Sequence, residues 1–283
     1  MQVLSLVNQK GGCGKTTTAV NLAGALAARG ERVLLVDLDP QAHATMALGQ
    51  APEEYEATVS EVLLDEAQVG EAILRCPGGI DLLPARLDLG EFEEVSGRLL
   101  HPEQRLRVVL EGLRDRYGWV VVDCPPRADG VLCANALFAS TTVLLVVETG
   151  AFALQGALQA LRVFDEAAER QNRVYRIRVV GTLFDRRTRF ARELLIALHG
   201  RFAGAMYDTV IRSSVRLREG PAVGLPIQEH APASRAAADF AALAEEICLD
   251  KQAVLPSSEG ALVGVEPLRE LGLTGPAGRL GTH

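Results

Sequence analysis

The chain has 283 residues, of which 48% are hydrophobic. This is enough to bury one large α/β core, an arrangement that we favour over two small domains. No apolar run is long enough to span a bilayer and no charged leader precedes Val3, so we expect a cytoplasmic protein that does not bind membranes. The five cysteines are scattered without C-x-x-C spacing, as in reduced cytosolic proteins. The net charge of −7, taken alone, argues against a nucleic-acid partner.

Short β-branched runs alternate with helical stretches along the chain. Buried parallel strands have this composition, and the helices between them connect the strands on either face of a sheet. The pattern therefore predicts an α/β fold with a mostly parallel, twisted sheet flanked by helices on both faces. In chain order we expect strand Val3–Val7, helix Lys15–Arg29, strands Arg32–Asp37 and Ile80–Leu83, helix Pro102–Arg116, strands Trp119–Asp123 and Thr142–Val147, helix Phe152–Arg170, strand Ile177–Leu183, and helices Thr188–His199 and Ala233–Cys248.

The composition changes near residue 250, where the chain becomes rich in Gly and Pro. Such segments bury too little apolar surface to offset the entropy lost on folding. We therefore predict one folded domain over residues 1–249 and a mostly disordered tail over residues 250–283, with one short helical turn around Glu266–Leu271.

A glycine-rich loop follows the first predicted strand and opens the first predicted helix. Residues 8–18 read NQKGGCGKTTT, which matches the phosphate-binding pattern G-x-x-x-x-G-K-[ST] except at Gln9, where the first glycine is missing. Glycines let backbone N–H groups approach phosphate oxygens, and the helix N-terminus adds its positive end. The alternative is a glycine-rich turn without a ligand. The loop residues predicted to contact a nucleotide are Gly11, Gly12, Cys13, Gly14, Lys15, Thr16 and Thr17.

Two lysines lie in this loop. Lys10, Lys15 and Lys251 are the only lysines among 29 basic residues, so two of them in one loop indicate that a compact ammonium is needed there. We expect Lys15 to hold the β- and γ-phosphates of a nucleotide and the Thr16 hydroxyl to bind Mg²⁺.

Three aspartates stand at or just beyond the ends of predicted strands, where open α/β sheets place their ligands. Asp37 and Asp39 in VLLVDLDPQ share one side of an extended chain, so both can face a metal ion and its waters. Asp123 ends the run WVVVDCPP, the form of a Walker-B element that holds Mg²⁺. For Asp37 and Asp39 the alternative is a polar strand end that caps the next helix. The nearby His43 is interpreted as a solvated loop residue rather than a metal ligand.

The motifs KGGCGKTT, VDLDPQ and VVVDCPP together resemble the ParA family of partition ATPases, the deviant-Walker P-loop group that includes MinD. The resemblance covers roughly residues 2–249. It implies an ATPase that uses ATP and Mg²⁺ and forms a homodimer on binding ATP, with Lys10 as the signature lysine that reaches the partner's phosphates. It also implies that Asp39 helps to position the attacking water. The implied catalytic residues are Lys10, Lys15 and Asp39, and the implied metal ligands are Thr16, Asp37 and Asp123.

Further matches to this family lie in LLPARLDL, TLFDRRT and TVIRSSVRLREGPAVGLPIQEHAP, the last of which resembles the family's segment near the base and the dimer interface. The chain departs from the family pattern at Cys13, where Val is usual, and at Ala42 and His43, where Gly-Asn is usual. It also departs at Arg127, after the Walker-B prolines, and at Arg212 and Ser213, where Pro-Arg is usual. ATP binding is expected in spite of these departures.

Arginines are concentrated in one part of the chain. From Arg162 to Arg218 there are thirteen arginines and six acidic residues, a net charge of +7 that leaves −14 for the remainder. Such asymmetry is typical of a polyanion-binding face, with paired charges on surface helices as the alternative. Arg187 in DRRT and Arg216 in SVRL match positions where members of the resembled family carry basic residues that bind DNA. The predicted DNA-binding residues are Arg187, Arg189, Arg216 and Arg218.

The resemblance thus implies an ATP-driven dimeric switch that binds double-stranded DNA without sequence preference. With a ParB-type partner, such a switch segregates chromosomes or plasmids on the nucleoid. One alternative is a MinD-like membrane-cycling ATPase, which requires a basic amphipathic C-terminal helix, whereas this chain's C-terminal residues include few basic side chains. A second is an iron–sulfur reductase of the nitrogenase iron-protein type, in which Cys124 and Cys133 hold a cluster between two subunits.

Overall fold

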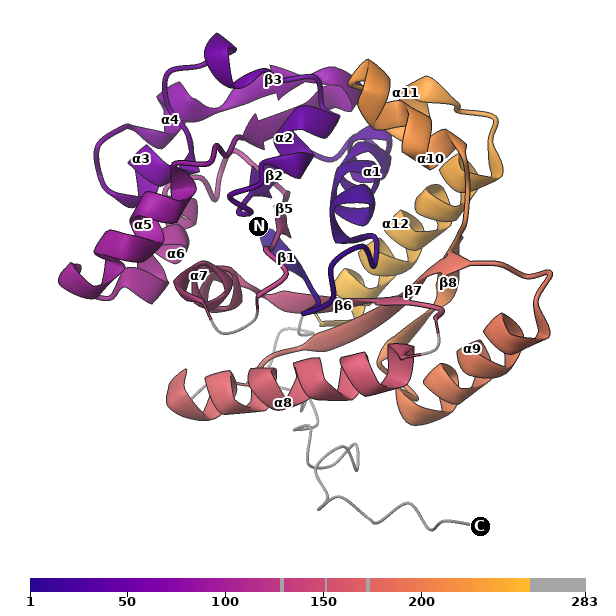
Figure 1. Cartoon of the computed structure of the whole chain (residues 1–283). Coiled ribbons are helices and arrows are strands. Elements are labelled where there is room, and N and C mark those ends of the chain that lie inside the picture. Colours follow the sequence, from indigo (N-terminus) through magenta and orange to yellow (C-terminus); the bar gives the residue numbers. More distant parts are fainter. Residues whose placement is uncertain (128–129, 151, 172–173, 255–283) are drawn as a thin grey trace.

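An eight-stranded sheet forms the centre of the molecule (Figure 1). The computed structural model describes residues 1–127, 130–150, 152–171 and 174–254. The strands are β1 (Gln2–Val7), β2 (Val33–Asp37), β3 (Leu74–Cys76), β4 (Ile80–Leu83), β5 (Trp119–Asp123), β6 (Thr142–Glu148), β7 (Ile177–Phe184) and β8 (Met206–Arg212). They lie in the order β3-β4-β2-β5-β1-β6-β7-β8, and all neighbours are parallel except β3 and β4. The predicted α/β class is confirmed.

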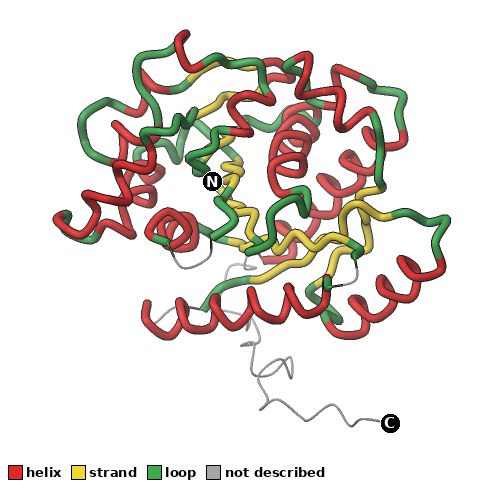
Figure 2. Tube along the Cα trace, viewed as in Figure 1, coloured by secondary structure: helices red, strands yellow, loops and turns green. Residues whose placement is uncertain are grey.

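Helices cover both faces of this sheet (Figure 2). They are α1 (Lys15–Ala28), α2 (His43–Ala47), α3 (Val59–Leu63), α4 (Val69–Ala72), α5 (Leu89–Val95), α6 (Arg105–Glu111), α7 (Val131–Ala139), α8 (Ala153–Gln171), α9 (Arg189–Arg201), α10 (Arg216–Glu219), α11 (Ile227–His230) and α12 (Arg235–Val254). Val120 and Val122 of β5 pack into one core with α5 to α8, whereas Trp119 and Val121 pack into a second core with α1, α2 and α12. Because side chains alternate across a strand, one apolar run supplies both cores.

Two strands of the sheet were not predicted. β3 has three residues, and β8 is an edge strand in which only Tyr207 and Ile211 are buried. Neither has the continuous apolar run that is typical of a buried parallel strand. The expected helix Pro102–Arg116 is also shorter in the structure. A 3₁₀ turn over Pro102–Gln104 precedes α6, which ends at Glu111.

Helix α12 continues past residue 249, the predicted end of the folded domain, and ends at Val254. Asp250 in this helix accepts hydrogen bonds from Arg178 Nε of β7 at 2.9 Å and from the Tyr207 hydroxyl of β8 at 3.0 Å. Residue 250 therefore packs against the sheet. Residues 255–283 of the predicted tail, with the expected turn around Glu266–Leu271, lie outside the described residues.

The strand register brings the three sequence motifs to one edge of the sheet. Asp37 at the end of β2 pairs in register with Asp123 at the end of β5, and Asp123 pairs with Leu6 of β1. The glycine-rich loop follows β1 directly. The carboxyl edge of these central strands is where doubly wound sheets bind their ligands.

Candidate functional site

The loop between β1 and α1 exposes its backbone. Gly12 and Gly14 have φ angles of 75° and 91°, in the region that favours glycine. A Cβ at Gly11 or Gly12 would meet nothing within 4 Å, whereas one at Gly14 would contact Thr182. Backbone N–H groups at the start of the 14-residue helix α1 can therefore approach an anion without obstruction by side chains.

The two loop lysines have different environments. Lys15 is 7% exposed, and its Nζ donates to the Lys10 carbonyl at 3.2 Å. The Lys10 side chain is 48% exposed and forms an ion pair with Glu148 at the end of β6. The Lys10 backbone is fixed by Asn8, whose Oδ1 accepts from the Lys10 N–H at 2.9 Å. One lysine is thus held within the loop, and the other lies at its surface.

Cys13 is fully buried, and burial raises the pKa of its thiol. Its carbonyl accepts a hydrogen bond from the Thr182 hydroxyl at 2.7 Å, which ties the loop to β7. Because the side chain is buried, a contact between Cys13 and a nucleotide would involve its backbone.

Asp37 and Asp123 are both fully buried. Asp37 Oδ2 accepts from the N–H and the hydroxyl of Thr45, each at 2.8 Å. Burial raises the pKa of Asp37 to about 6, against the effect of these hydrogen bonds. Burial, and next the charge of Asp37, raise the pKa of Asp123 well above its usual value, while the nearby Thr16 hydroxyl opposes the rise. Among the described residues, neither carboxylate oxygen of Asp123 has a hydrogen-bond partner.

The donor set at this edge fits Mg²⁺. Asp123, a buried carboxyl group without a hydrogen-bond partner among the described residues, lies beside Asp37 and the Thr16 hydroxyl, and this arrangement favours a hard cation. Within the described part of the chain, no three His, Cys, Asp or Glu side chains form a metal-binding group by themselves. In proteins, Mg²⁺ commonly binds one or two carboxylates together with substrate phosphates and water.

A cavity of about 700 Å³ lies over the loop and α1. Its walls come from the loop, α1, α2 and the segment from α10 to α11. Asp39 and His43 line it, and His43 is exposed at the start of α2, which agrees with a solvated residue. The predicted site residues in the wall are Gly11, Gly12, Gly14, Lys15, Thr16, Thr17, Asp39, Arg216 and Arg218.

The chain is similar in sequence to a known family and to several named proteins. Residues 1–177 match a family described as an AAA domain. The chain is 40% identical over 251 residues to the chromosome-partitioning ATPase Soj of Thermus thermophilus, covering 86% of this chain and 94% of that protein. It is 38% identical over 231 residues to the chromosome partitioning protein ParA of Caulobacter vibrioides, covering 80% and 86%. The chain belongs to the ParA/Soj family of partitioning ATPases.

Solved structures have a fold similar to that of this ParA/Soj-family chain. Cobyrinic acid a,c-diamide synthase from Mycobacterium smegmatis has a TM-score of 0.77 and 29% identity, covering 94% of this chain and 99% of that one. The cell division ATPase MinD of Pyrococcus furiosus has a TM-score of 0.70 and 27% identity, covering 88% and 98%. The fold is thus that of the ParA/MinD group of P-loop ATPases.

The four arginines predicted to bind DNA lie in two places on this ParA/Soj-family protein. Arg187 and Arg189 are at the start of α9, paired with Asp185 at 2.7 Å and Glu193 at 2.6 Å. Arg216, paired with Glu219 at 2.8 Å, and Arg218 are on α10 and line the cavity. Several other arginines of the basic segment are also paired with acids: Arg176 and Arg178 with Asp250, and Arg212 with Asp239. The surface is therefore less basic than the residue count indicates.

The described residues can be compared with what each of the two alternative functions requires, an iron–sulfur cluster or a membrane-binding helix. Cys124 and Cys133 are both buried, at 1% and 2% exposed, and a cluster shared between subunits needs thiols at the surface. Among the described residues, no helix is long and apolar enough to cross a membrane. A MinD-like amphipathic end would fall in residues 255–283, outside the described part of the chain.

Three residues that shape the site were not predicted from the sequence. Thr45 binds Asp37, Thr182 binds the Cys13 carbonyl, and Glu148 pairs with Lys10. Glu148 ends β6, directly after the predicted strand Thr142–Val147, so a polar residue at a strand end was an available signal. Thr45 and Thr182 have no comparable local signal.

Proposed function

We propose that this protein is an ATP-dependent dimerising switch. The monomer binds ATP with Mg²⁺, two monomers associate around the nucleotides, and the dimer binds DNA without sequence preference until ATP is hydrolysed. The observation that carries this proposal is the separation of the two loop lysines. Lys15 is buried against its own loop, and Lys10 is exposed where a second chain can approach it. Hydrolysis aided from a second chain needs such an exposed cation beside the phosphate loop.

Each site residue has a role in this proposal. Mg²⁺ would be held by Thr16, Asp37 and Asp123, and it would supply positive charge beside the phosphates. A structure of the similar synthase contains bound ADP and magnesium, which supports this assignment. Asp39, which lines the cavity, orients the attacking water. Lys15 and the partner's Lys10 stabilise negative charge on the phosphoryl oxygens.

The cellular role rests on the relatives and on the arginines. The curated relatives named as partitioning ATPases support segregation of chromosomes or plasmids, with a ParB-type partner and on the nucleoid. We assign the DNA contacts to Arg187, Arg189, Arg216 and Arg218. These residues follow the carboxyl ends of the neighbouring strands β7 and β8. Guanidinium groups in such positions can contact backbone phosphates whatever the base sequence.

Separate replacement of the two loop lysines tests the switch. Lys15→Ala should lower the affinity for a fluorescent ATP analogue by about ten- to a hundredfold, because it removes a charged donor. Lys10→Ala should bind the analogue but stay monomeric with ATP in light scattering, and it should not hydrolyse ATP. Lys251→Ala is the matched control, since Lys251 Nζ lies 4.9 Å from the centroid of the Trp119 ring, at the amino-terminal end of β5.

Two results would contradict the proposal. Normal affinity in folded Lys15→Ala protein would exclude the phosphate-loop assignment. ATP-dependent dimers and normal turnover in Lys10→Ala would exclude a role for Lys10 across the dimer. Sedimentation with lipid vesicles and ATP tests the membrane-cycling alternative, and we expect no binding.

A further inference from the structure

Thr45 connects the Asp37 carboxylate to a second layer of polar contacts. It lies in α2 and is 0% exposed. Both its N–H and its hydroxyl donate to the same oxygen of Asp37, each at 2.8 Å. The other oxygen of Asp37 accepts the Asp39 N–H at 3.2 Å. Because both oxygens have donors, the orientation of the carboxylate is limited as well as its position.

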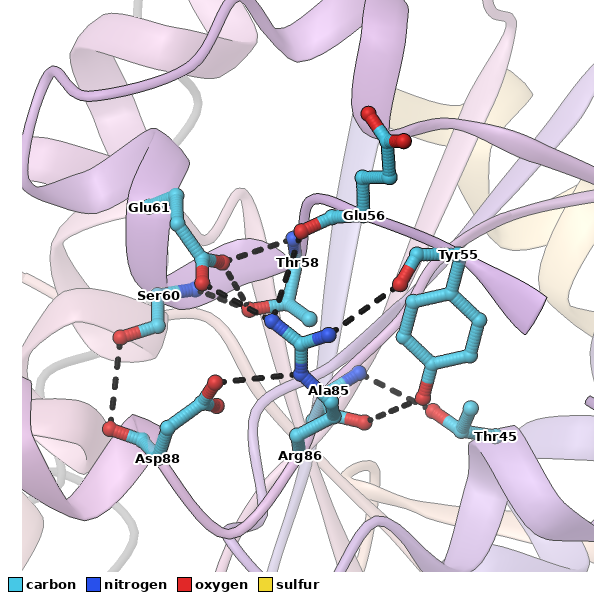
Figure 3. A network of polar contacts seen from close by, with 9 residues as sticks. All are labelled: Thr45, Tyr55, Glu56, Thr58, Ser60, Glu61, Ala85, Arg86 and Asp88. Atoms are coloured by element: carbon cyan, nitrogen blue, oxygen red, sulfur yellow. Dashed lines mark hydrogen bonds and ion pairs between the residues drawn. The ribbon is translucent and has the colours of Figure 1, made fainter. Parts of the chain in front are cut away.

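The Thr45 hydroxyl is itself held in place. It accepts a hydrogen bond from the Ala85 N–H at 3.1 Å while it donates to Asp37. The Ala85 carbonyl in turn accepts the Tyr55 hydroxyl at 3.0 Å (Figure 3). Tyr55 and Ala85 are both buried. A buried hydroxyl with one donor and one acceptor partner has a defined proton direction, so the Thr45 proton points to Asp37.

An ion cluster closes the outer end of this chain of contacts. Arg86 Nη1 donates to the Tyr55 carbonyl at 3.1 Å, and the guanidinium lies 5.6 Å from the centre of the Tyr55 ring. The same guanidinium pairs with Glu61 at 3.0 Å and Asp88 at 3.1 Å (Figure 3). Arg86 follows Ala85 in the chain, and its guanidinium contacts Tyr55. The ion cluster therefore limits the movement of both partners in the hydrogen bond between the Tyr55 hydroxyl and the Ala85 carbonyl.

We infer that Thr45 is the positioning residue for the Asp37 carboxylate, and that Tyr55 and Arg86 position Thr45 through Ala85. This inference rests on the proposed function, in which Asp37 takes part in binding Mg²⁺. Thr45 does not touch the metal or the nucleotide in this scheme, because its only free proton is directed to Asp37. It acts by limiting the orientations of a carboxylate whose neighbour Asp123 lacks hydrogen-bond partners among the described residues.

Valine and serine at position 45 separate the effect of the Thr45 hydroxyl from the effect of its shape. The valine side chain has the shape of that of threonine but neither donates to Asp37 nor accepts from Ala85, so only the backbone N–H bond to Asp37 remains, whereas serine keeps both hydroxyl contacts and loses only a methyl group. Thr45→Val should therefore raise the Mg²⁺ concentration for half-maximal ATP-analogue binding by about tenfold, the range found for residues that orient metal ligands. Thr45→Ser should remain close to the wild-type value.

The measurement is a Mg²⁺ titration of fluorescent ATP-analogue binding by the full chain, with EDTA as the zero point. Binding in EDTA should be the same for both variants and the wild type, because Thr45 acts through the metal ligand. Thr142→Val is the matched control, a buried threonine at the amino-terminal end of β6. A purely structural role for Thr45 would lower thermal stability in Thr45→Val and leave the Mg²⁺ requirement unchanged.

Asp37→Asn separates the two proposals. If Asp37→Asn leaves the Mg²⁺ requirement at the wild-type value, the metal role of Asp37 is wrong. If Asp37→Asn raises it and folded Thr45→Val does not, the metal role stands and the inference about Thr45 fails. If Thr45→Val does not fold, Tyr55→Phe decides. It removes only the bond to the Ala85 carbonyl and should raise the requirement by a smaller factor, and a wild-type value would overturn the inference.

Discussion

Asp39 differs from the other two aspartates of the site in what surrounds its carboxylate. Asp37 and Asp123 are fully buried, whereas Asp39 lines the cavity and accepts the Gln41 N–H at 2.9 Å. A carboxylate in the cavity wall can contact a water molecule beside a bound nucleotide, and one behind the wall acts through a metal ion. All three acids are buried, and contact with the cavity distinguishes Asp39 from the other two.

Replacement of Asp39 tests this division. Asp39→Ala should bind ATP and dimerise, but hydrolyse ATP about a hundredfold more slowly, the order of effect of a single general base. Single-turnover hydrolysis measures the rate, and size-exclusion chromatography with ATP should show that the dimer accumulates. Glu54→Ala, which removes an exposed carboxylate that is not among the residues lining the cavity, is the control. Wild-type turnover in Asp39→Ala would remove this residue from the mechanism.

Helix α12 is fixed to the sheet by charge as well as by apolar packing. Phe240 and Leu243 pack into the core that α12 shares with α1. Near the end of the helix, Asp250 binds Arg178 and Tyr207 and also pairs with Arg176. One carboxylate therefore joins α12 to the last two strands, at the end of the sheet where the arginine-rich segment lies.

Asp250→Ala should lower the free energy of unfolding by about 2 kcal/mol at pH 7, since charged donors lose their shared acceptor. Burial alone would raise the pKa of Asp250, but the hydrogen bond and charge of Arg178 hold it below its usual value. A depressed native pKa stabilises the fold above the unfolded-state pKa of about 4, and this stabilisation is lost as the pH falls through the native pKa. The difference between wild type and variant should therefore be smaller at low pH.

Urea unfolding at neutral pH and below about pH 3 measures that difference. Glu245→Ala is the control, because it removes an exposed carboxylate from the same helix. We expect Glu245→Ala to change stability little at either pH. An Asp250→Ala deficit of equal size at both pH values would show that its carboxylate contributes by packing and not by charge.

The features predicted from the sequence are local, and the missed contacts are long-range. Gly14, Lys15 and Asp123 could be proposed as site residues because strand, loop and helix signals lie within a few residues of each. Thr45 and Lys10 have partners 40 and 138 residues away. Those contacts depend on the strand order around β1 and β2, which local patterns do not encode. Asp250 was assigned to a tail because the composition changes there, yet ion pairs to distant residues hold it in α12.

Acidic and basic residues are concentrated at opposite ends of the sheet. Residues 53–94 contain twelve acidic residues and two arginines, and they include β3 and β4. Residues 162–218 include β7 and β8, at the other end of the strand order. Although ion pairs reduce the basic surplus, the side chains of Arg187 and Arg189 remain 85% and 87% exposed. A polyanion should approach the β7–β8 end and be repelled from the β3–β4 end.

A dimer would present this basic end twice, and avidity would rise through effective concentration without any new kind of contact. We therefore expect ATP, and not ADP, to increase affinity for two unrelated DNA duplexes alike. Affinity should fall with salt at a logarithmic slope of about −0.9 for each phosphate neutralised. Gel shifts with ADP, ATP and a slowly hydrolysed analogue, across a salt series, measure both effects.

Replacement of arginines tests which surface of the protein binds DNA. Arg187→Glu combined with Arg216→Glu should abolish binding to both duplexes and flatten the salt slope, because each loses a phosphate contact and gains repulsion. Arg216 lines the cavity, so ATP binding and dimerisation must be shown intact before a loss is attributed to DNA. Arg114→Glu makes the same charge change outside the basic segment and should bind normally. Preference for one duplex or equal binding with ADP and ATP would contradict the switch, whereas unchanged binding by the double variant would place the DNA surface elsewhere.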